Sequence, residues 1–252
     1  MKRAHRLLGV GLLLALLGLW QLSAQSWVDS ANWPPVSEIL KALAAGIGSG
    51  ELTEVFASTL WRMAVGFCLA TLAGVGLGLA MASLPTLDAA LTPLVELLRP
   101  IPIPAIVPPL ILLLGIDDAM KIFVVSFACF FPVLVNTVSG VRAVDPTALD
   151  TARTLQVGRL RTMLKVVLPA SLPYVLAGMR TSLALALIVS VVAEMIAGSE
   201  GIGYYIMSMQ YAMRAGDMYA AIFLLAAVGY CLNLVLLGVE RWLLHWWQRE
   251  QV

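Results

Sequence analysis

Charged residues are scarce in this sequence. Lys, Arg, Asp and Glu make up 12% of its 252 residues, against about 25% in an ordinary soluble domain. Hydrophobic residues make up 60%, and a soluble chain of this size cannot bury so much apolar surface. This composition excludes a secreted globular enzyme, a nucleic-acid-binding protein and a disordered chain. It predicts an integral membrane protein, for which lipid is the second solvent.

Residues that form disulfides or bind metals are also few. The three cysteines, Cys68, Cys129 and Cys231, each lie in an apolar run, and there is no CxxC motif. Such cysteines usually behave as small hydrophobic side chains. The two histidines, His5 and His245, lie near opposite ends of the sequence. We therefore predict neither a structural disulfide nor a metal site.

Long apolar segments recur along the chain. A transmembrane helix needs about 20 predominantly apolar residues. We expect six such helices, at about 7–23, 60–82, 90–115, 119–141, 172–196 and 217–240. The predicted fold class is therefore an all-α integral membrane protein, with one transmembrane domain over residues 1–252 and a basic loop at 142–171.

The first apolar segment has a second interpretation. Its basic start and the sequence Leu22-Ser23-Ala24 resemble a cleavable signal peptide. The apolar run through Trp20 is long for a signal peptide, and Ala24 supplies only half of a small-x-small cleavage site. We expect the segment to be retained as a span; its removal would leave five spans in the same orientation.

The distribution of charge predicts the orientation, because lysine and arginine concentrate in cytoplasmic loops. Basic residues precede the first span, fill the loop after the fourth and follow the sixth: Lys2, Arg3, Arg6, Arg142, Arg153, Arg159, Arg161, Lys165, Arg241 and Arg249. The other side is mainly acidic, with Asp29, Glu38, Glu51, Glu54, Asp117, Asp118, Glu200 and Asp217. With six spans the basic segments share one side, so we expect both termini in the cytoplasm.

A stripe of small residues marks the second span. Every fourth position is small, at Gly66, Ala70, Gly74, Gly78 and Ala82. Such a stripe lets helix backbones approach closely in lipid. We expect it to pack against another helix of the same chain, and a contact between subunits is the alternative.

Prolines crowd the third span, at Pro100, Pro102, Pro104, Pro108 and Pro109. From Ala90 to Pro102 a helix would rise about 18 Å, close to the bilayer midplane, and Pro132 lies at a similar depth in the fourth span. Broken backbone at that depth requires surrounding protein or water, and transporters place substrate paths at such breaks. Pro102, Pro104, Pro132 and Asn136 are therefore candidates for a translocation path, with a simple kink as the alternative.

Two ionisable residues flank the fifth span. Arg180 and Glu194 are about 21 Å apart along a helix, too far to pair. Arg180 can extend toward the cytoplasm, whereas Glu194 falls near the outer surface. An ionisable residue near a span is a functional candidate, so Glu194 is either part of a gate or path, or simply hydrated at the interface.

The basic loop predicts a helical hairpin. Asp145 followed by Pro146 is a typical helix start, and Gly158 would end that helix in the left-handed conformation. A second short helix over 159–167 would end before Pro169. On these features alone, a solvated loop that only fixes the topology remains an alternative.

This loop resembles a known family motif. The segments DTARTL (150–155) and VVLP (166–169) resemble the EAA loop of permease subunits of bacterial ABC importers, which reads Glu-Ala-Ala, three residues, Gly, nine residues, Ile-x-Leu-Pro. Asp150, Thr151, Gln156 and Val166 depart from that motif. Segments 99–116, 121–142, 172–180 and 191–206 resemble the nitrate, sulfonate and taurine branch of the family.

The resemblance implies a type I ABC importer permease fold in the bacterial inner membrane. It implies a permease homodimer, a cytoplasmic ABC ATPase dimer that binds ATP and Mg, and an extracytoplasmic binding protein that delivers a small solute such as a sulfonate, taurine or nitrate. The loop would couple the permease to the ATPase. The residues that the motif points to are Asp150, Ala152, Arg153, Leu155, Gln156, Gly158, Leu168 and Pro169.

The chain itself has no nucleotide-binding motif. It contains neither G-x-x-x-x-G-K-[ST] nor any Gly-Lys pair, so we expect a transport subunit without a catalytic site or cofactor of its own. A stand-alone secondary transporter would need an inverted repeat or a coupling-ion site, and an intramembrane enzyme would need a catalytic constellation. A scaffold protein would not need prolines at the midplane. The resemblance leaves the solute open, because selectivity in such systems rests largely with the binding protein.

Overall fold

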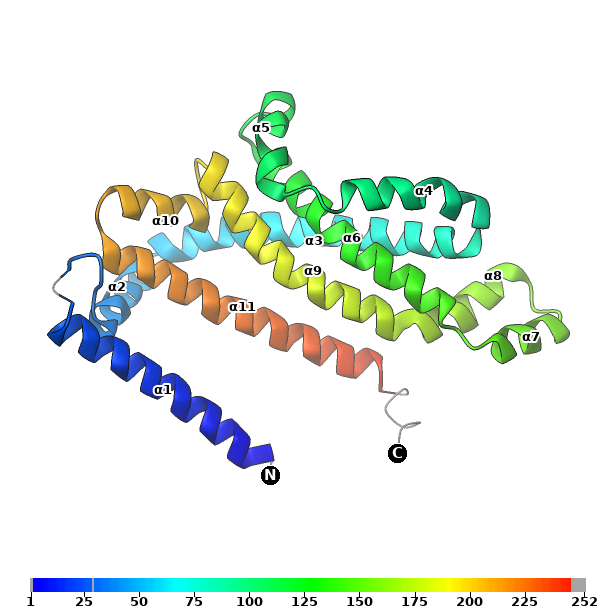
Figure 1. Cartoon of the computed structure of the whole chain (residues 1–252), viewed down its shortest axis with the longest axis horizontal. Coiled ribbons are helices and arrows are strands. Elements are labelled where there is room, and N and C mark those ends of the chain that lie inside the picture. Colours follow the sequence, from blue (N-terminus) through cyan, green and yellow to red (C-terminus); the bar gives the residue numbers. More distant parts are fainter. Residues whose placement is uncertain (1, 29, 246–252) are drawn as a thin grey trace.

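The computed structural model describes residues 2–28 and 30–245, and side chains from residue 8 onward. Part of the predicted orientation depends on Lys2, Arg3, Arg6, Asp29 and Arg249, whose side chains lie outside the described residues. Figure 1 shows an elongated bundle of helices. One end carries α2 and α10, and the opposite end carries α7 and α8.

The described part of the chain folds into helices joined by short turns. In chain order these are α1 (Lys2–Ser26), α2 (Val36–Gly48), α3 (Glu51–Ser83), α4 (Pro85–Leu98), α5 (Ile103–Leu114), α6 (Asp118–Arg142), α7 (Pro146–Thr154), α8 (Arg159–Thr162), a π-helical turn (Met163–Val167), α9 (Leu168–Ala197), α10 (Ile202–Tyr211) and α11 (Ala215–Leu243). Five segments are long and apolar enough to cross a membrane: the part of α1 from Leu8, α3, α6, the run Arg159–Ala197 that includes α9, and α11. The pair α4 and α5 makes a sixth if it forms one broken span.

The third span is interrupted at its prolines rather than continuous. We expected one helix at 90–115, but α4 and α5 are separate helices bent by 99° at the intervening break. Pro100 and Pro102 cause the break, because neither offers a backbone N–H to continue the helix. Arg99, before Pro100, still has helical dihedrals, with φ −57° and ψ −42°. Pro102 is extended, with φ −67° and ψ 128°, and precedes the first turn of α5.

The core lies between α3, α6 and α9, and α5 adds Val107 to it. The small-residue stripe of α3 faces α6. A Cβ added at Gly66 would lie 2.8 Å from Val125, and one at Gly78 would lie 2.7 Å from Thr137. The predicted packing within the chain is therefore confirmed, and the close approach of α3 and α6 depends on the absence of side chains at these positions.

This packing predicts a large difference between two neighbouring glycines. A Cβ at Gly74 would lie 3.0 Å from Val133, whereas Gly76, two residues on, has nothing within 4 Å. We expect Gly74→Leu to lower the free energy of unfolding by about 1–3 kcal/mol or more, because overpacking separates the helices. Gly76→Leu should be neutral or slightly stabilising, since glycine is a poor helix former. Thermal unfolding in detergent measures both; equal midpoints for the two variants would contradict the packing.

The two peripheral helices bury little of their surface within the chain. None of the apolar window of α1 is buried, and 6% of that of α11 is. Trp20 anchors α1: its indole N–H donates to the carbonyl of Pro34 at 3.1 Å, and its ring stacks on Trp33 with centroids 4.7 Å apart. The exposed leucines of α1 are thus left for lipid or another subunit to cover.

Candidate functional site

A cavity of about 400 Å³ lies beside the break between α4 and α5. We call it the midplane cavity, after the depth that the sequence predicts for the break. Its lining is mostly apolar and comes from the break, α5, α6 and α9. Of the four residues predicted for a translocation path, Pro132 and Asn136 line it, and Pro102 and Pro104 do not. Helices α6 and α9 meet closely here, because a Cβ at Gly178 would lie 2.9 Å from the Pro132 carbonyl oxygen.

A second, smaller cavity of about 220 Å³ continues toward the start of α4. We call it the lower cavity. Arg99 and Val135 line both cavities, so the two cavities lie next to each other. At the far end of the lower cavity Asp88 of α4 pairs with Arg142 at 2.6 Å. This ion pair joins α4 to the last residue of α6, where the basic loop begins.

Glu194 lies in neither cavity. Its side chain is completely buried near the end of α9, so hydration at the interface is the wrong interpretation. The Thr59 hydroxyl lies 2.9 Å from each of its carboxylate oxygens, and the backbone N–H of Gly203 donates to it at 3.1 Å. Ile202 in turn donates its backbone N–H to the Thr59 hydroxyl at 2.9 Å. Glu194 therefore ties α9 to α3 and to the start of α10.

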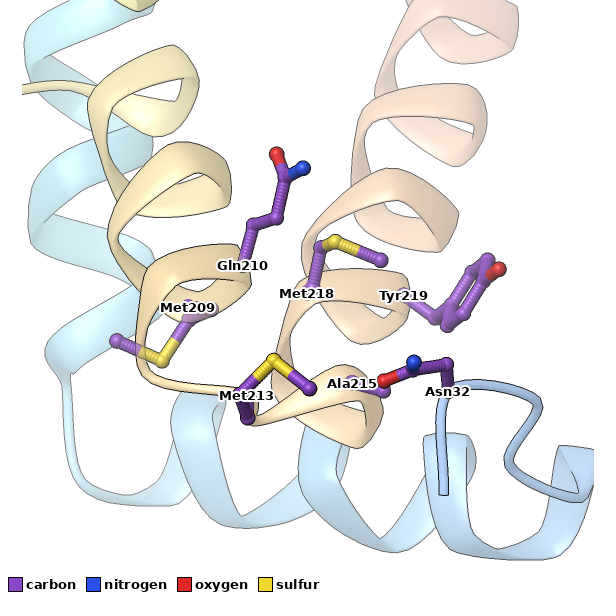
Figure 2. A pocket seen from close by; sticks show the side chains of 7 residues that line it. All are labelled: Asn32, Met209, Gln210, Met213, Ala215, Met218 and Tyr219. Atoms are coloured by element: carbon purple, nitrogen blue, oxygen red, sulfur yellow. The ribbon is translucent and has the colours of Figure 1, made fainter. Parts of the chain in front are cut away.

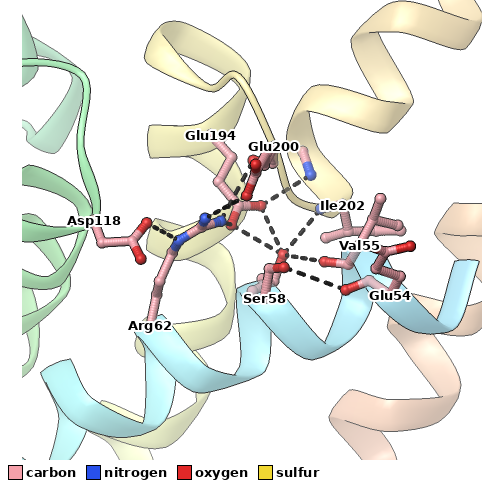
Figure 3. Close-up of polar contacts among 10 residues, drawn as sticks. Glu54, Val55, Ser58, Arg62, Asp118, Glu194, Glu200 and Ile202 are labelled. Atoms are coloured by element: carbon pink, nitrogen blue, oxygen red, sulfur yellow. Dashed lines mark hydrogen bonds and ion pairs between the residues drawn. The ribbon is translucent and has the colours of Figure 1, made fainter.

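Arg62 gathers three carboxylates around one guanidinium (Figure 3). Its Nη1 lies 3.2 Å from Glu194, its Nε 2.6 Å from Asp118, and its Nη2 3.3 Å from Glu200. The Arg62 side chain is 5% exposed, whereas those of Asp118 and Glu200 are largely exposed. These four residues, with Thr59, join α3, α6, α9 and the turn before α10. We call them the outer cluster, after the orientation that the charges predict.

The glycines around the outer cluster permit this contact. A Cβ at Gly201 would lie 2.3 Å from the Glu194 carboxylate, and Gly201 has φ 103°, which favours glycine. Lys121 of α6 is also buried beside the cluster. Neither Arg62 nor Thr59 was predicted as a site residue from the sequence. The available signal was an arginine within an otherwise apolar helix, together with the EGIG turn that follows Glu194.

The basic loop forms the hairpin of α7 and α8 at one end of the molecule (Figure 1). The predicted start is confirmed, since the Asp145 carboxylate accepts the backbone N–H of Thr147 at 2.9 Å. The predicted end is wrong. Gly158 has φ −59°, and the left-handed residue is Gln156, with φ 52°. The left-handed turn therefore occurs at the position where the EAA motif has its glycine, although this chain has Gln156 there.

The second half of the loop also differs from expectation. The helix predicted over 159–167 does not end before Pro169. It continues through the π-helical turn into α9, whose first turn contains Leu168 and Pro169. Proline is tolerated in a first helical turn, and a π-helical turn shifts the hydrogen bonding just before it. The loop is therefore joined to α9 without a flexible break.

The loop residues divide into buried and exposed groups. Ala152 is 5% exposed and packs within this chain, whereas Leu155 is 70% and Leu160 73% exposed. Arg153 pairs with Asp150 at 2.8 Å on the exposed surface. Two large leucines thus stand out on a polar hairpin, without apolar cover from the described chain.

The end opposite the hairpin carries another cavity. A cavity of about 280 Å³ lies between α10, α11 and the segment before α2. Figure 2 shows the residues that line it, Asn32, Met209, Gln210, Met213, Ala215, Met218 and Tyr219. Met213 holds φ 56°, and its side chain is 68% exposed. Beside it, Arg214 pairs with Asp217 at 2.8 Å. This end therefore combines a hollow with exposed methionine and charged side chains.

Comparison with known proteins identifies the family of this chain. Residues 70–248 match the model of the binding-protein-dependent transport system inner membrane component. The chain belongs to this family. It is 33% identical over 246 residues to the permease protein SsuC of Bacillus subtilis (strain 168), covering 97% of this chain and 89% of SsuC. It is also 30% identical to the taurine transport system permease protein TauC of Escherichia coli (strain K12), covering 95% and 89% of the two chains.

Further comparisons agree. The nitrate import permease protein NrtB of Leptolyngbya laminosa is 31% identical, covering 86% of this chain and 80% of NrtB. Among solved structures, the inward-facing MetNI methionine ABC transporter matches with a TM-score of 0.69 at 16% identity, over 76% of this chain and 95% of that chain. That likeness shows a shared fold, the type I ABC importer permease fold predicted above.

Membership fixes the general role of the chain. It is a multi-pass inner-membrane permease subunit of an ABC importer, and a transport component rather than an enzyme. Such a system also includes an ATPase and a binding protein. Within the described residues, no group of three or more His, Cys, Asp or Glu side chains could hold a metal ion.

Proposed function

We propose that this permease forms the inward path for a small sulfonate, taurine, nitrate or a similar solute, delivered by an extracytoplasmic binding protein. The observation that carries the proposal is the α4–α5 break, which opens beside the midplane cavity in the middle of an otherwise tightly packed bundle. Irregular backbone at membrane depth is tolerated where it lines a cavity. The names of TauC and NrtB support the class of solute.

The hairpin of α7 and α8 is proposed to dock on the ATPase dimer, which binds ATP and Mg. Leu155 and Leu160 would supply the apolar contact, because they are exposed and a partner surface would remove them from water. Gln156 and Gly158 shape the turn between them, and Asp150 and Arg153 add a charged edge. The continuous link through Leu168 and Pro169 would carry movement of the hairpin into α9.

A second copy of the chain is proposed to complete the path. No residue of α4 is buried within the chain, and α5 buries only Val107. Exposed leucines such as Leu94 and Leu97 leave this side apolar. A homodimer would cover it and enclose the two cavities, while lipid would cover the outer faces of α1 and α11.

The same arrangement supports the orientation predicted from the charges. The start of α1 and the end of α11 both lie away from the end that carries α2 and α10 (Figure 1). If the hairpin faces the cytoplasm, both termini do too, and the hollow around Met213 faces outward. That outer end is the proposed contact for the binding protein.

Uptake in reconstituted vesicles tests the proposal. The permease is combined with its ATPase and binding protein, and labelled taurine, an alkanesulfonate and nitrate are each supplied outside with ATP inside. We expect ATP-dependent accumulation of at least one of them. Accumulation of none, from a complex that hydrolyses ATP normally, would contradict the proposed solute class.

The path predicts where aqueous reagents reach the protein. Single cysteines at Pro132 and Asn136, with the three native cysteines replaced, should react with small charged thiol reagents in the assembled transporter. Val125, fully buried between α3 and α6, is the matched control and should stay unreactive. We expect ATP to change the rate at Asn136 at least several-fold. Protection of Pro132 and Asn136 in every state would mean that the cavity is closed packing.

A further inference from the structure

Arg99 is the notable charge of the midplane cavity. It follows α4, about 21 Å from that helix's first residue at 1.5 Å per residue. It lines both the midplane and the lower cavity. Its guanidinium has no hydrogen-bond or ion-pair partner among the described residues. Arg99 is exposed in the single chain, and a cation at membrane depth is costly unless it meets water or an opposite charge.

The other polar groups of the midplane cavity suit an anion. No carboxylate occurs among the described residues that line it. The Asn136 side-chain amide donates one N–H to the Pro132 carbonyl at 2.8 Å, which leaves its second N–H available. Thr181 adds a hydroxyl to the lining, which donates to the Ala177 carbonyl at 3.2 Å. The cavity thus offers a cation and a spare donor without a competing acid.

The remaining walls are apolar. Ile101, Ile103, Phe127, Leu185 and Val189 surround the polar groups. An inorganic oxyanion alone would leave this apolar surface without a partner. A short aliphatic chain attached to the anionic group would cover it, and about 400 Å³ is within the usual range for small-ligand pockets.

We propose that the permease itself binds an organic sulfonate at the midplane cavity, with Arg99 as the anion-binding residue. This inference rests on the proposed transport function. The planar guanidinium can donate two parallel N–H bonds to two sulfonate oxygens. The spare Asn136 N–H reaches the third oxygen, and the aliphatic tail lies against the apolar walls. Specificity then lies partly in the membrane subunit as well as in the binding protein.

The lower cavity supplies a means of release. Glu96 lines it, three residues before Arg99 on the same helix, and residues at that spacing can pair. Its carboxylate repels an anion that moves toward the start of α4. It can also take the place of the sulfonate on Arg99, so that the anion leaves rather than remaining bound.

Binding to the assembled permease–ATPase complex, without binding protein and without ATP, tests this site. Equilibrium dialysis with radiolabelled butane-1-sulfonate measures the dissociation constant. We expect Arg99→Gln to raise it at least tenfold. Arg241→Gln is the matched control, because it removes an exposed arginine near the end of α11 that does not line the cavity. Glu96→Gln should bind as tightly as the unaltered protein or more tightly.

Two further outcomes bear on the inference. Butane-1-sulfonate should bind more tightly than methanesulfonate or nitrate, since only the longer tail reaches the apolar walls; equal binding of all three would overturn the sulfonate assignment. Unchanged binding in Arg99→Gln, or no binding to the unaltered complex, would overturn the site. Uptake by the unaltered complex, measured with ATP and binding protein, tests the transport function separately. If the complex takes up solute but shows none of the expected binding, the site is wrong and the transport function stands. If the complex takes up no solute, the transport function is refuted.

Discussion

Arg62→Met is expected to lower the free energy of unfolding by about 3–5 kcal/mol, the usual cost of leaving one partner of a buried ion pair uncompensated. The physical reason is Glu194, whose carboxylate is completely buried and would lose its cation. Asp118 and Glu200 are exposed and would be hydrated instead. Thermal unfolding of the detergent-solubilised protein, with the yield of folded protein, measures the effect.

Two companion variants make this test specific. Arg214→Met removes another arginine from the outer end, but its pair with Asp217 is exposed, so we expect a change of no more than about 1 kcal/mol. The double variant Arg62→Met/Glu194→Gln removes both charges and should recover part of the loss. A double variant less stable than Arg62→Met would mean that the Arg62–Glu194 pair is not the cause.

Leu155→Asp is expected to reduce association with the ATPase at least tenfold while the permease still folds and inserts. The side chain is 70% exposed on the hairpin, so a charge there costs little within the chain, but it would cost much in an apolar cleft. Copurification of the ATPase and substrate-stimulated ATP hydrolysis in vesicles measure the effect. Leu160→Asp should act in the same direction.

Leu155 is a better site for this test than Ala152, because Ala152 is buried within the chain. Ala152, which keeps the family motif, packs inside this chain, so a large residue there would disturb the hairpin itself as well as any docking. Thr147→Asp is the matched control: it adds the same charge on exposed surface at the start of α7, where an acidic group favours the helix dipole. Full ATPase association in Leu155→Asp would place the interface elsewhere.

Features set by local bonding were predictable. The start of α7 needs only Asp145 and Pro146, because the cap is a hydrogen bond to a backbone N–H two residues away. The small-residue stripe of α3 could be recognised from its spacing of four, since that spacing alone puts the residues on one face. Composition and apolar run length likewise determined the class, a helical membrane protein, because lipid admits few other structures.

Features set by contacts between distant segments were not predictable. The proline cluster predicted a break in the third span. The 99° angle between α4 and α5 could not be predicted, because α4 packs against α3 while α5 packs against α6 and α9. Gly158 was the expected left-handed residue, but the hairpin places Gln156 there. In both cases the residue type allowed several backbone paths, and the surrounding chain decided between them.

The outer cluster shows most clearly what the sequence determined and what only the tertiary structure decided. The sequence by itself determined that Glu194 ends an apolar helix and that a glycine-rich turn follows. It could not show that Arg62, 132 positions earlier, supplies the counter-charge. Arg99 is the reverse case, since its charge is plain in the sequence and only the fold leaves it unpaired beside a cavity. Periodicity and capping act over a few residues, whereas the partner of a buried charge depends on which helices pack together.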